Sequence, residues 1–205
     1  MTDLYAVTIS PAAMCDLFEA ERDRTGNLPP NYAANPGAAV PVVRKDEDGE
    51  RTVELMRWGL PAGHGAKPVA AIQSIDDPRW PDLVKPRHRC LIPANAFSEG
   101  VEHQWFARDE SRTPFAFAGV WLPAERGGKD ARGLCAILIN SVNGLTASEG
   151  QQPMPVVLTE DEWGEWLDGD NEEARAVLKR PAETLLTVVS TGEERDPPAS
   201  RMGYQ

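Results

Sequence analysis

The sequence predicts one mixed α+β domain built around an antiparallel sheet, over residues 1–190. Three observations support this fold class. The chain of 205 residues fits one sizeable domain. Several short apolar segments separated by turn residues are typical of strands, and two to three segments carry helix signals. Short strands mixed with a few helices are the pattern of an α+β domain.

The first helix signal follows the first apolar segment. Ser10 suits an N-cap and Pro11 suits the first helical position. Met14, Leu17 and Phe18 then recur at helical spacing and predict a buried stripe. The strands expected from apolar segments between turns are residues 4–9, 40–43, 52–58, 90–93, 114–121, 134–140 and 155–158.

The second helix signal lies near the C-terminus. Thr159 and Glu162 match a capping box, and the helix behind them carries Trp163 and Trp166, which we expect in the core. A further helix over 171–179 and a strand over 185–190 follow. Residues 191–205 are charged and rich in proline, so we expect a poorly ordered tail. Residues 61–86 lack a clean period and are expected to form a long ordered loop.

Composition excludes several classes of protein. Hydrophobic residues make up 41% and charged residues 26% of the chain, as in an ordinary globular protein. No apolar run is long enough for a membrane span, and the N-terminus does not resemble a signal peptide. The three cysteines, Cys15, Cys90 and Cys135, are widely separated. We therefore expect buried cysteines, no metal, no cofactor and a cytoplasmic location.

Net charge weighs against nucleic-acid binding without excluding it. The formal charge is −11, whereas proteins that bind nucleic acids usually present a basic face. The densest positive stretch runs from Lys85 to Arg89 and includes Arg87. Short charge runs of this kind are more often solvated turns than binding sites.

Four strings carry a family resemblance. They are Arg22 to Pro30, Arg57 to Pro61, Arg89 to Glu99, and Pro153 to Thr159. Each string alone is weak, but the ordered set over residues 1 to about 190 resembles the SOS response-associated peptidase (SRAP) family. The resemblance implies an SRAP-like domain with a barrel-like sheet and a role in recognising abasic sites in single-stranded DNA, with no metal or cofactor.

The resemblance also implies a reaction at the N-terminus. In the family, Met1 is removed and the amine of a cysteine at position 2 attacks the abasic aldehyde, after which the thiol closes a thiazolidine ring. This chain has Thr2 there. An α-amine has a pKa near ~8, so a Thr2 amine could still form an imine, but without sulfur no thiazolidine can form. Thr2 could equally be only an N-terminal residue. Glu99 matches the family's catalytic Glu.

Other family positions are altered. The slot of the family's Asn falls on Ala71, or on Gln73 if the alignment slips, and Gln73 otherwise takes the place of a DNA-contacting Arg. The slot of the family's His falls on Gly150 or Gln151, neither of which titrates near neutral pH. The histidines present, His64, His88 and His103, are expected in loops or at the surface. The residues expected to contact DNA are Trp58, Gly59, Gln73, Trp80, Arg87 and Arg89.

Three functions remain open at this point. The first is recognition of abasic or single-stranded DNA, with the Cys-dependent reaction lost. The second is a degenerate binding or regulatory module that keeps the fold without DNA chemistry. The third is a hydrolase with Thr2 as an N-terminal nucleophile, which needs an oxyanion hole that the sequence does not reveal.

Overall fold

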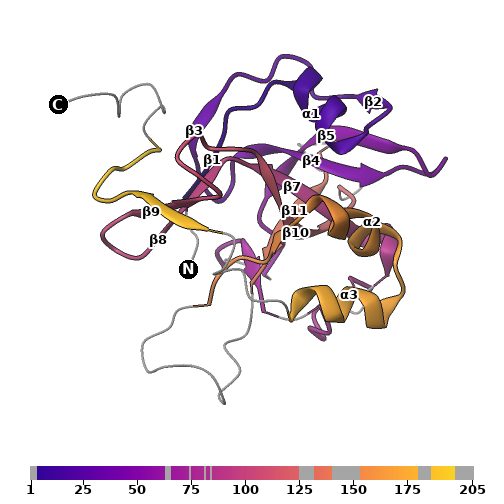
Figure 1. The fold of residues 1–205 in the computed structure, drawn as a ribbon. Helices are drawn as coiled ribbons and strands as arrows, with labels where there is room; N and C mark the ends of the chain where they lie inside the picture. The colour runs from indigo at the N-terminus through magenta and orange to yellow at the C-terminus, as the bar shows by residue number, and fades with distance from the viewer. Residues whose placement is uncertain are drawn as a thin grey trace.

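The computed structural model describes residues 4–62, 66–73, 75–80, 82, 83, 85–124, 132–139, 153–179 and 186–196. Two sheets and three flanking α-helices share one main hydrophobic core (Figure 1). The mixed α+β class with a barrel-like sheet is therefore confirmed. None of the helices in this described part is long and apolar enough to cross a lipid bilayer.

Five strands of the larger sheet close into a barrel. Each pairs with the next around a ring, in the order β10, β7, β4, β5, β11 and back to β10. The pairing is antiparallel except between β5 and β11, which run parallel. Their bounds are β4 (Ala39–Lys45), β5 (Arg51–Trp58), β7 (Arg89–Ala94), β10 (Phe115–Leu122) and β11 (Leu134–Leu138). The short strands β2 (Arg22–Asp23), β6 (Ala71–Ile72) and β12 (Val157–Leu158) pair along this ring.

The smaller sheet holds the N-terminal strand in its interior. Its order is β13 (Thr187–Ser190), β9 (Gln104–Ala107), β8 (Ala96–Glu99), β1 (Leu4–Val7) and β3 (Asn31–Ala34). Because side chains alternate between the faces of a strand, one face packs against the barrel and the other holds a small separate cluster around Trp105. β1 therefore has a strand on each side and a core on each face.

The helices begin where the sequence predicts. In α1 (Pro11–Phe18) the Ser10 hydroxyl accepts a hydrogen bond from the Ala13 N–H, at 3.3 Å. In α2 (Glu160–Asp168) the Thr159 N–H donates to the Glu162 carboxylate, at 2.7 Å. Trp163 and Trp166 of α2 are buried in the core, as expected. The helix expected over 171–179 is α3 (Asn171–Leu178). A single 3₁₀ turn, η1 (Pro86–His88), leads into β7.

The expected strands are confirmed as elements, but five further strands come from segments that carry no clear period. β2 and β6 pair with the larger sheet, whereas β3, β8 and β9 belong to the smaller sheet. These strands are short. Their extended form depends on the neighbouring strands with which they pair rather than on a pattern in their own sequence.

Residues 191–196, which the sequence assigns to a poorly ordered tail, make tertiary contacts in this structure. The Gly192 N–H donates to the Glu102 carbonyl at 2.9 Å, and the Trp105 indole donates to the Glu193 carbonyl at 2.7 Å. Asp196 is buried and forms an ion pair with buried Arg112, at 3.2 Å. These tertiary contacts hold a segment whose own sequence predicts disorder. Residues 197–205 lie outside the described residues.

Candidate functional site

The N-terminal strand enters the fold beside the predicted catalytic carboxylate. β1 pairs antiparallel with β8, and its first residue, Leu4, lies opposite Ser98. Glu99 is the next residue and the last of β8, and it is only 7% exposed. The structure thus brings the N-terminal end of β1 and Glu99 to the same end of one sheet. Thr2 lies outside the described residues.

A chain of aromatic contacts links this region to β6. Tyr5 of β1 packs edge-on against Trp58, with ring centroids 4.9 Å apart. The Trp58 indole N–H donates to the Ala70 carbonyl at 2.9 Å, directly before β6. Ala71 therefore lies on a strand fixed to the same core as β1, and Gln73 follows that strand in an exposed position. Ala71 has only a methyl group, so it cannot supply the amide of the family's Asn.

Gly59 has a structural reason to be glycine. Its φ is +131°, a conformation that L side chains rarely adopt, and a Cβ there would lie 2.6 Å from the Pro68 Cβ. The Gly59 N–H also donates to the Cys135 carbonyl at 2.7 Å. Leu60 and Val69 then exchange two backbone hydrogen bonds of 2.9 Å. The Gly59 conformation thus lets the loop after β5 turn back, so that Val69 pairs with Leu60 at the start of that loop.

Trp58 is not a stacking platform in this structure. Its side chain is 0% exposed, and a base needs an open ring face to stack. Trp80 is 7% exposed, with the Arg79 guanidinium 4.4 Å from its ring centroid. Neither ring therefore offers an open face to a base in this conformation, and DNA contact by these residues stays a prediction.

Arg89 is a structural residue as well. It is 1% exposed and donates to the Gly169 carbonyl at 2.7 Å and to the Asn171 side chain at 2.9 Å. The guanidinium therefore binds carbonyls at the C-terminal end of α2, where a helix has unsatisfied acceptors and a partial negative charge. In this structure the Arg89 guanidinium is bonded within the fold at the end of α2, and its contact with a phosphate stays a prediction.

Arg87 is exposed but lies apart from Glu99. It belongs to η1, beside the hairpin between β4 and β5, whereas the N-terminal end of β1 lies near the opposite end of β5 through the Tyr5–Trp58 contact. Arg87 is thus not brought to the end of β5 where Trp58 and Gly59 lie. Exposed cations nearer Trp58 are Arg57 and Lys67.

Asn95 was missed by the sequence reasoning, although it lies within the string from Arg89 to Glu99. Its side-chain carbonyl accepts from the Thr8 N–H at 2.7 Å, and its amide donates to the Arg112 carbonyl at 2.9 Å. Asn95 is 5% exposed. The signal was a polar residue within an otherwise apolar string. It holds Thr8, directly after the C-terminal end of β1.

The cysteines offer no alternative nucleophile. Cys90 and Cys135 are fully buried, and burial raises the pKa of both thiols, so neither forms a thiolate at neutral pH. Burial also raises the pKa of Cys15, which is partly exposed on α1. Among the described residues, no group of His, Cys, Asp or Glu side chains could hold a metal ion.

Comparison with known proteins agrees with this architecture. A family model described as SOS response associated peptidase (SRAP) matches residues 1–193. A crystal structure of a Bordetella bronchiseptica protein superposes with a TM-score of 0.70 at 18% identity, covering 90% of this chain and 97% of its own. One from Bacteroides thetaiotaomicron gives 0.70 at 16% identity, covering 98% and 99%. A phage-related protein from B. bronchiseptica gives 0.65 at 21% identity, covering 90% and 92%. No curated protein matches.

Proposed function

Since this chain belongs to the SRAP family, we propose that it recognises abasic sites in single-stranded DNA through its N-terminal amine, beside Glu99. The observation that supports the proposal is the register of β1 and β8, in which Leu4 lies opposite Ser98. Thr2 precedes Leu4 by two residues, so the backbone limits its Cα to within about 7 Å of the Leu4 Cα. A carboxylate and an amine within that reach are what imine chemistry needs.

The reaction at this site is a reversible imine. With Met1 removed, the Thr2 nitrogen attacks the aldehyde carbon of the ring-opened abasic sugar, and the carbinolamine then loses its hydroxyl as water. Glu99 supplies the proton to that leaving hydroxyl. The Thr2 hydroxyl, far less acidic than a thiol, forms no stable ring. The expected product is a cross-link that hydrolyses unless it is reduced.

Binding in this proposal is weak and electrostatic. The chain carries a net charge of −11, and the side chains of Trp58 and Arg89 are buried in this structure. Exposed Arg57 and Lys67, beside the end of β5, are the cations placed to meet phosphates. We therefore expect binding that is measurable at low salt and falls steeply as salt is added.

Borohydride trapping tests the proposal. Abasic single-stranded DNA is incubated with the protein at low salt, with and without borohydride, after intact mass has shown whether Met1 is removed. The expected result is a covalent adduct only with borohydride, lost when the N-terminal amine is blocked. The variant Thr2→Cys should give a stable cross-link without borohydride.

Matched carboxylate variants test the role of Glu99. Glu99→Gln should slow trapping by about tenfold to a hundredfold, within the usual range for a lost general acid. Glu102→Gln changes an exposed carboxylate in the adjoining turn and should leave trapping unchanged. Equal rates in the two variants would remove Glu99 from the mechanism.

A degenerate binding module is the alternative that one observation favours. Ala71 stands on β6 in the slot of the family's Asn, so one assisting group is absent from the site. This alternative predicts low-salt binding of single-stranded DNA with no trapped adduct, even for Thr2→Cys. A retained Met1 would have the same consequence, because it blocks the Thr2 amine.

A further inference from the structure

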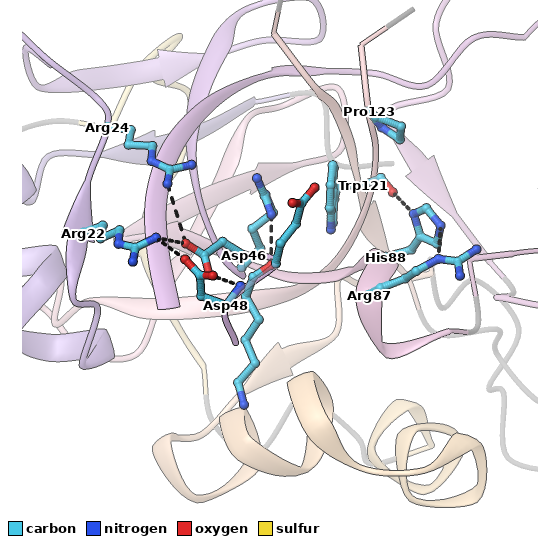
Figure 2. Close-up of a pocket in the computed structure, with 11 residues that line it drawn as sticks. Arg22, Arg24, Asp46, Asp48, Arg87, His88, Trp121 and Pro123 are labelled. Atoms are coloured by element: carbon cyan, nitrogen blue, oxygen red, sulfur yellow. Dashed lines mark hydrogen bonds and ion pairs between the residues drawn. The ribbon is translucent and has the colours of Figure 1, made fainter. Parts of the chain in front are cut away.

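A second candidate site lies at the other end of the barrel. A cavity of about 570 Å³ opens between the β4–β5 hairpin on one side and η1 with the end of β10 on the other (Figure 2). That volume falls within the usual range for small-molecule sites. Arg22, Arg24 and Asp46 form one wall, and Arg87, His88 and Trp121 form the other. β5 spans from this end to Trp58, so about 20 Å separates the cavity from that residue.

The first wall contains an ion-pair network in which the Arg24 guanidinium is only weakly engaged. Arg22 binds Asp46 at 2.5 Å, and its other nitrogen binds Glu50 at 2.6 Å. Asp46 is anchored further by the backbone N–H groups of Asp48 and Glu50. Arg24 makes only a 3.6 Å contact with Asp46, and its side chain is 49% exposed. The Arg24 guanidinium therefore keeps donors available to a ligand.

The second wall is aromatic. Trp121 has the Arg44 guanidinium 4.3 Å from its ring centroid, and the His88 ring lies 5.9 Å away, tilted by 49°. Trp121 is only partly buried, and its indole N–H is enclosed without a hydrogen-bond partner among the described residues. An enclosed donor of this kind is rare in folded proteins and costs stability unless something accepts its hydrogen bond.

His88 directs Arg87 toward the cavity. The His88 Nδ1 lies 3.1 Å from the Trp121 carbonyl, which can only accept, so Nδ1 carries the hydrogen. The His88 Nε2 then accepts from Arg87 Nε at 3.1 Å. Arg87 contacts Asp82 only at 3.4 Å and remains 64% exposed. The guanidinium is thus oriented by its Nε while its outer nitrogens face solvent.

Two guanidiniums at the cavity are only weakly engaged by carboxylates. The lining holds five Lys or Arg side chains and three Asp or Glu side chains, and three of the cations pair with carboxylates beyond the lining: Arg22 with Glu50, Arg44 with Glu54 and Lys45 with Asp168. Arg24 and Arg87 make only longer carboxylate contacts, of 3.6 Å and 3.4 Å, and stay exposed. An exposed guanidinium beside an aromatic wall suits a planar group joined to an anion.

We propose that this cavity binds a nucleotide, with its base against the exposed part of Trp121 and its phosphate held by Arg87 on the same wall. Arginine forks suit phosphate oxygens, and aromatic side chains suit bases of any sequence. The same chemistry is presented by a free nucleotide and by the 5′-phosphorylated end of a DNA strand. The site is independent of the N-terminal chemistry, since it uses none of the residues near Glu99.

Calorimetric titration of the full-length protein at low salt tests this assignment. The probes are deoxyadenosine monophosphate, deoxyadenosine, inorganic phosphate and a short 5′-phosphorylated oligonucleotide. We expect the monophosphate to bind more tightly than deoxyadenosine or phosphate alone. Oligonucleotide binding without monophosphate binding identifies a strand end as the ligand. Phosphate binding as tight as that of the monophosphate would overturn the proposal, and so would the absence of binding by both nucleotide probes.

Variants locate the site. Arg87→Gln should weaken binding by about tenfold, since a charge-assisted contact is lost. Arg79→Gln removes an exposed arginine that pairs with Asp77 outside the cavity, and it should have no effect. Equal affinity in Arg87→Gln and in this control would place the ligand elsewhere. Trp121→Leu should abolish the preference for the monophosphate over phosphate, with its melting temperature as the check on folding.

Discussion

Replacing Gly59 by alanine should destabilise the protein by an amount that the structure allows us to estimate. The φ of +131° strains any L side chain, and such a conformation costs of order 1–3 kcal/mol. The new Cβ would also lie 2.6 Å from the Pro68 Cβ, and relieving that overlap in a packed region costs about 1–3 kcal/mol. Together they predict a loss of about 2–5 kcal/mol in the free energy of unfolding.

The chain offers a matched control in Gly164. This glycine lies inside α2, and a Cβ built there meets no atom within 4 Å. Alanine is the better helix former by about 0.5–1 kcal/mol, so Gly164→Ala should stabilise the protein. The same chemical change, one methyl group, is therefore predicted to have opposite signs at the two positions.

Thermal and urea unfolding measure both variants. For a chain of this size about 1 kcal/mol shifts the melting temperature by about 2–4 °C. Gly59→Ala should therefore lower it by about 5–15 °C, and Gly164→Ala should raise it by a few degrees. A Gly59→Ala protein as stable as the parent would refute the reasoning, because neither the strain nor the overlap could then be real.

Three further changes have predicted outcomes. Burial lowers the pKa of His88, with Arg87 adding to the effect, so the unfolded state takes up a proton near pH ~6.5 before the folded state does. The free energy of unfolding should therefore decrease as the pH is lowered from about 7 to 5. In urea titrations, His88→Gln should make the free energy of unfolding depend less on pH. Asp196→Ala leaves buried Arg112 without its carboxylate and should release the C-terminal segment, seen as faster hydrogen exchange of the amides over 192–196. Arg89→Met leaves the carbonyls at the end of α2 without their donor and should cost about 2–4 kcal/mol in urea unfolding.

The local elements could be read from contiguous residues. Ser10 and Thr159 begin α1 and α2 because a cap depends on atoms within three or four residues of each other. The barrel strands followed from apolar segments between turns. Glu99, which its motif matches to the family's catalytic Glu, is the last residue of β8. The family resemblance rests on the same kind of evidence, since its motifs are short strings.

Burial could not be read in the same way. The positive stretch before β7 suggested a phosphate-binding run, yet Arg89 lies inside the fold because α2, about 80 residues later in the chain, ends against it. Trp58 has the character of a stacking platform, yet Tyr5 and Ala70 enclose it. A side chain's exposure depends on what packs over it, and those residues are distant in sequence.

By itself, then, the sequence determined the fold class, the helix starts, the family motifs and the presence of Thr2 at position 2. Only the tertiary structure decided which charges and rings face solvent, and that β1 begins beside Glu99. It also ordered residues 191–196 through the Arg112–Asp196 pair. The physical reason is the range of the interactions. Caps and periodicity act within a few residues, whereas strand register, burial and ion pairing join residues that only the closed fold brings together.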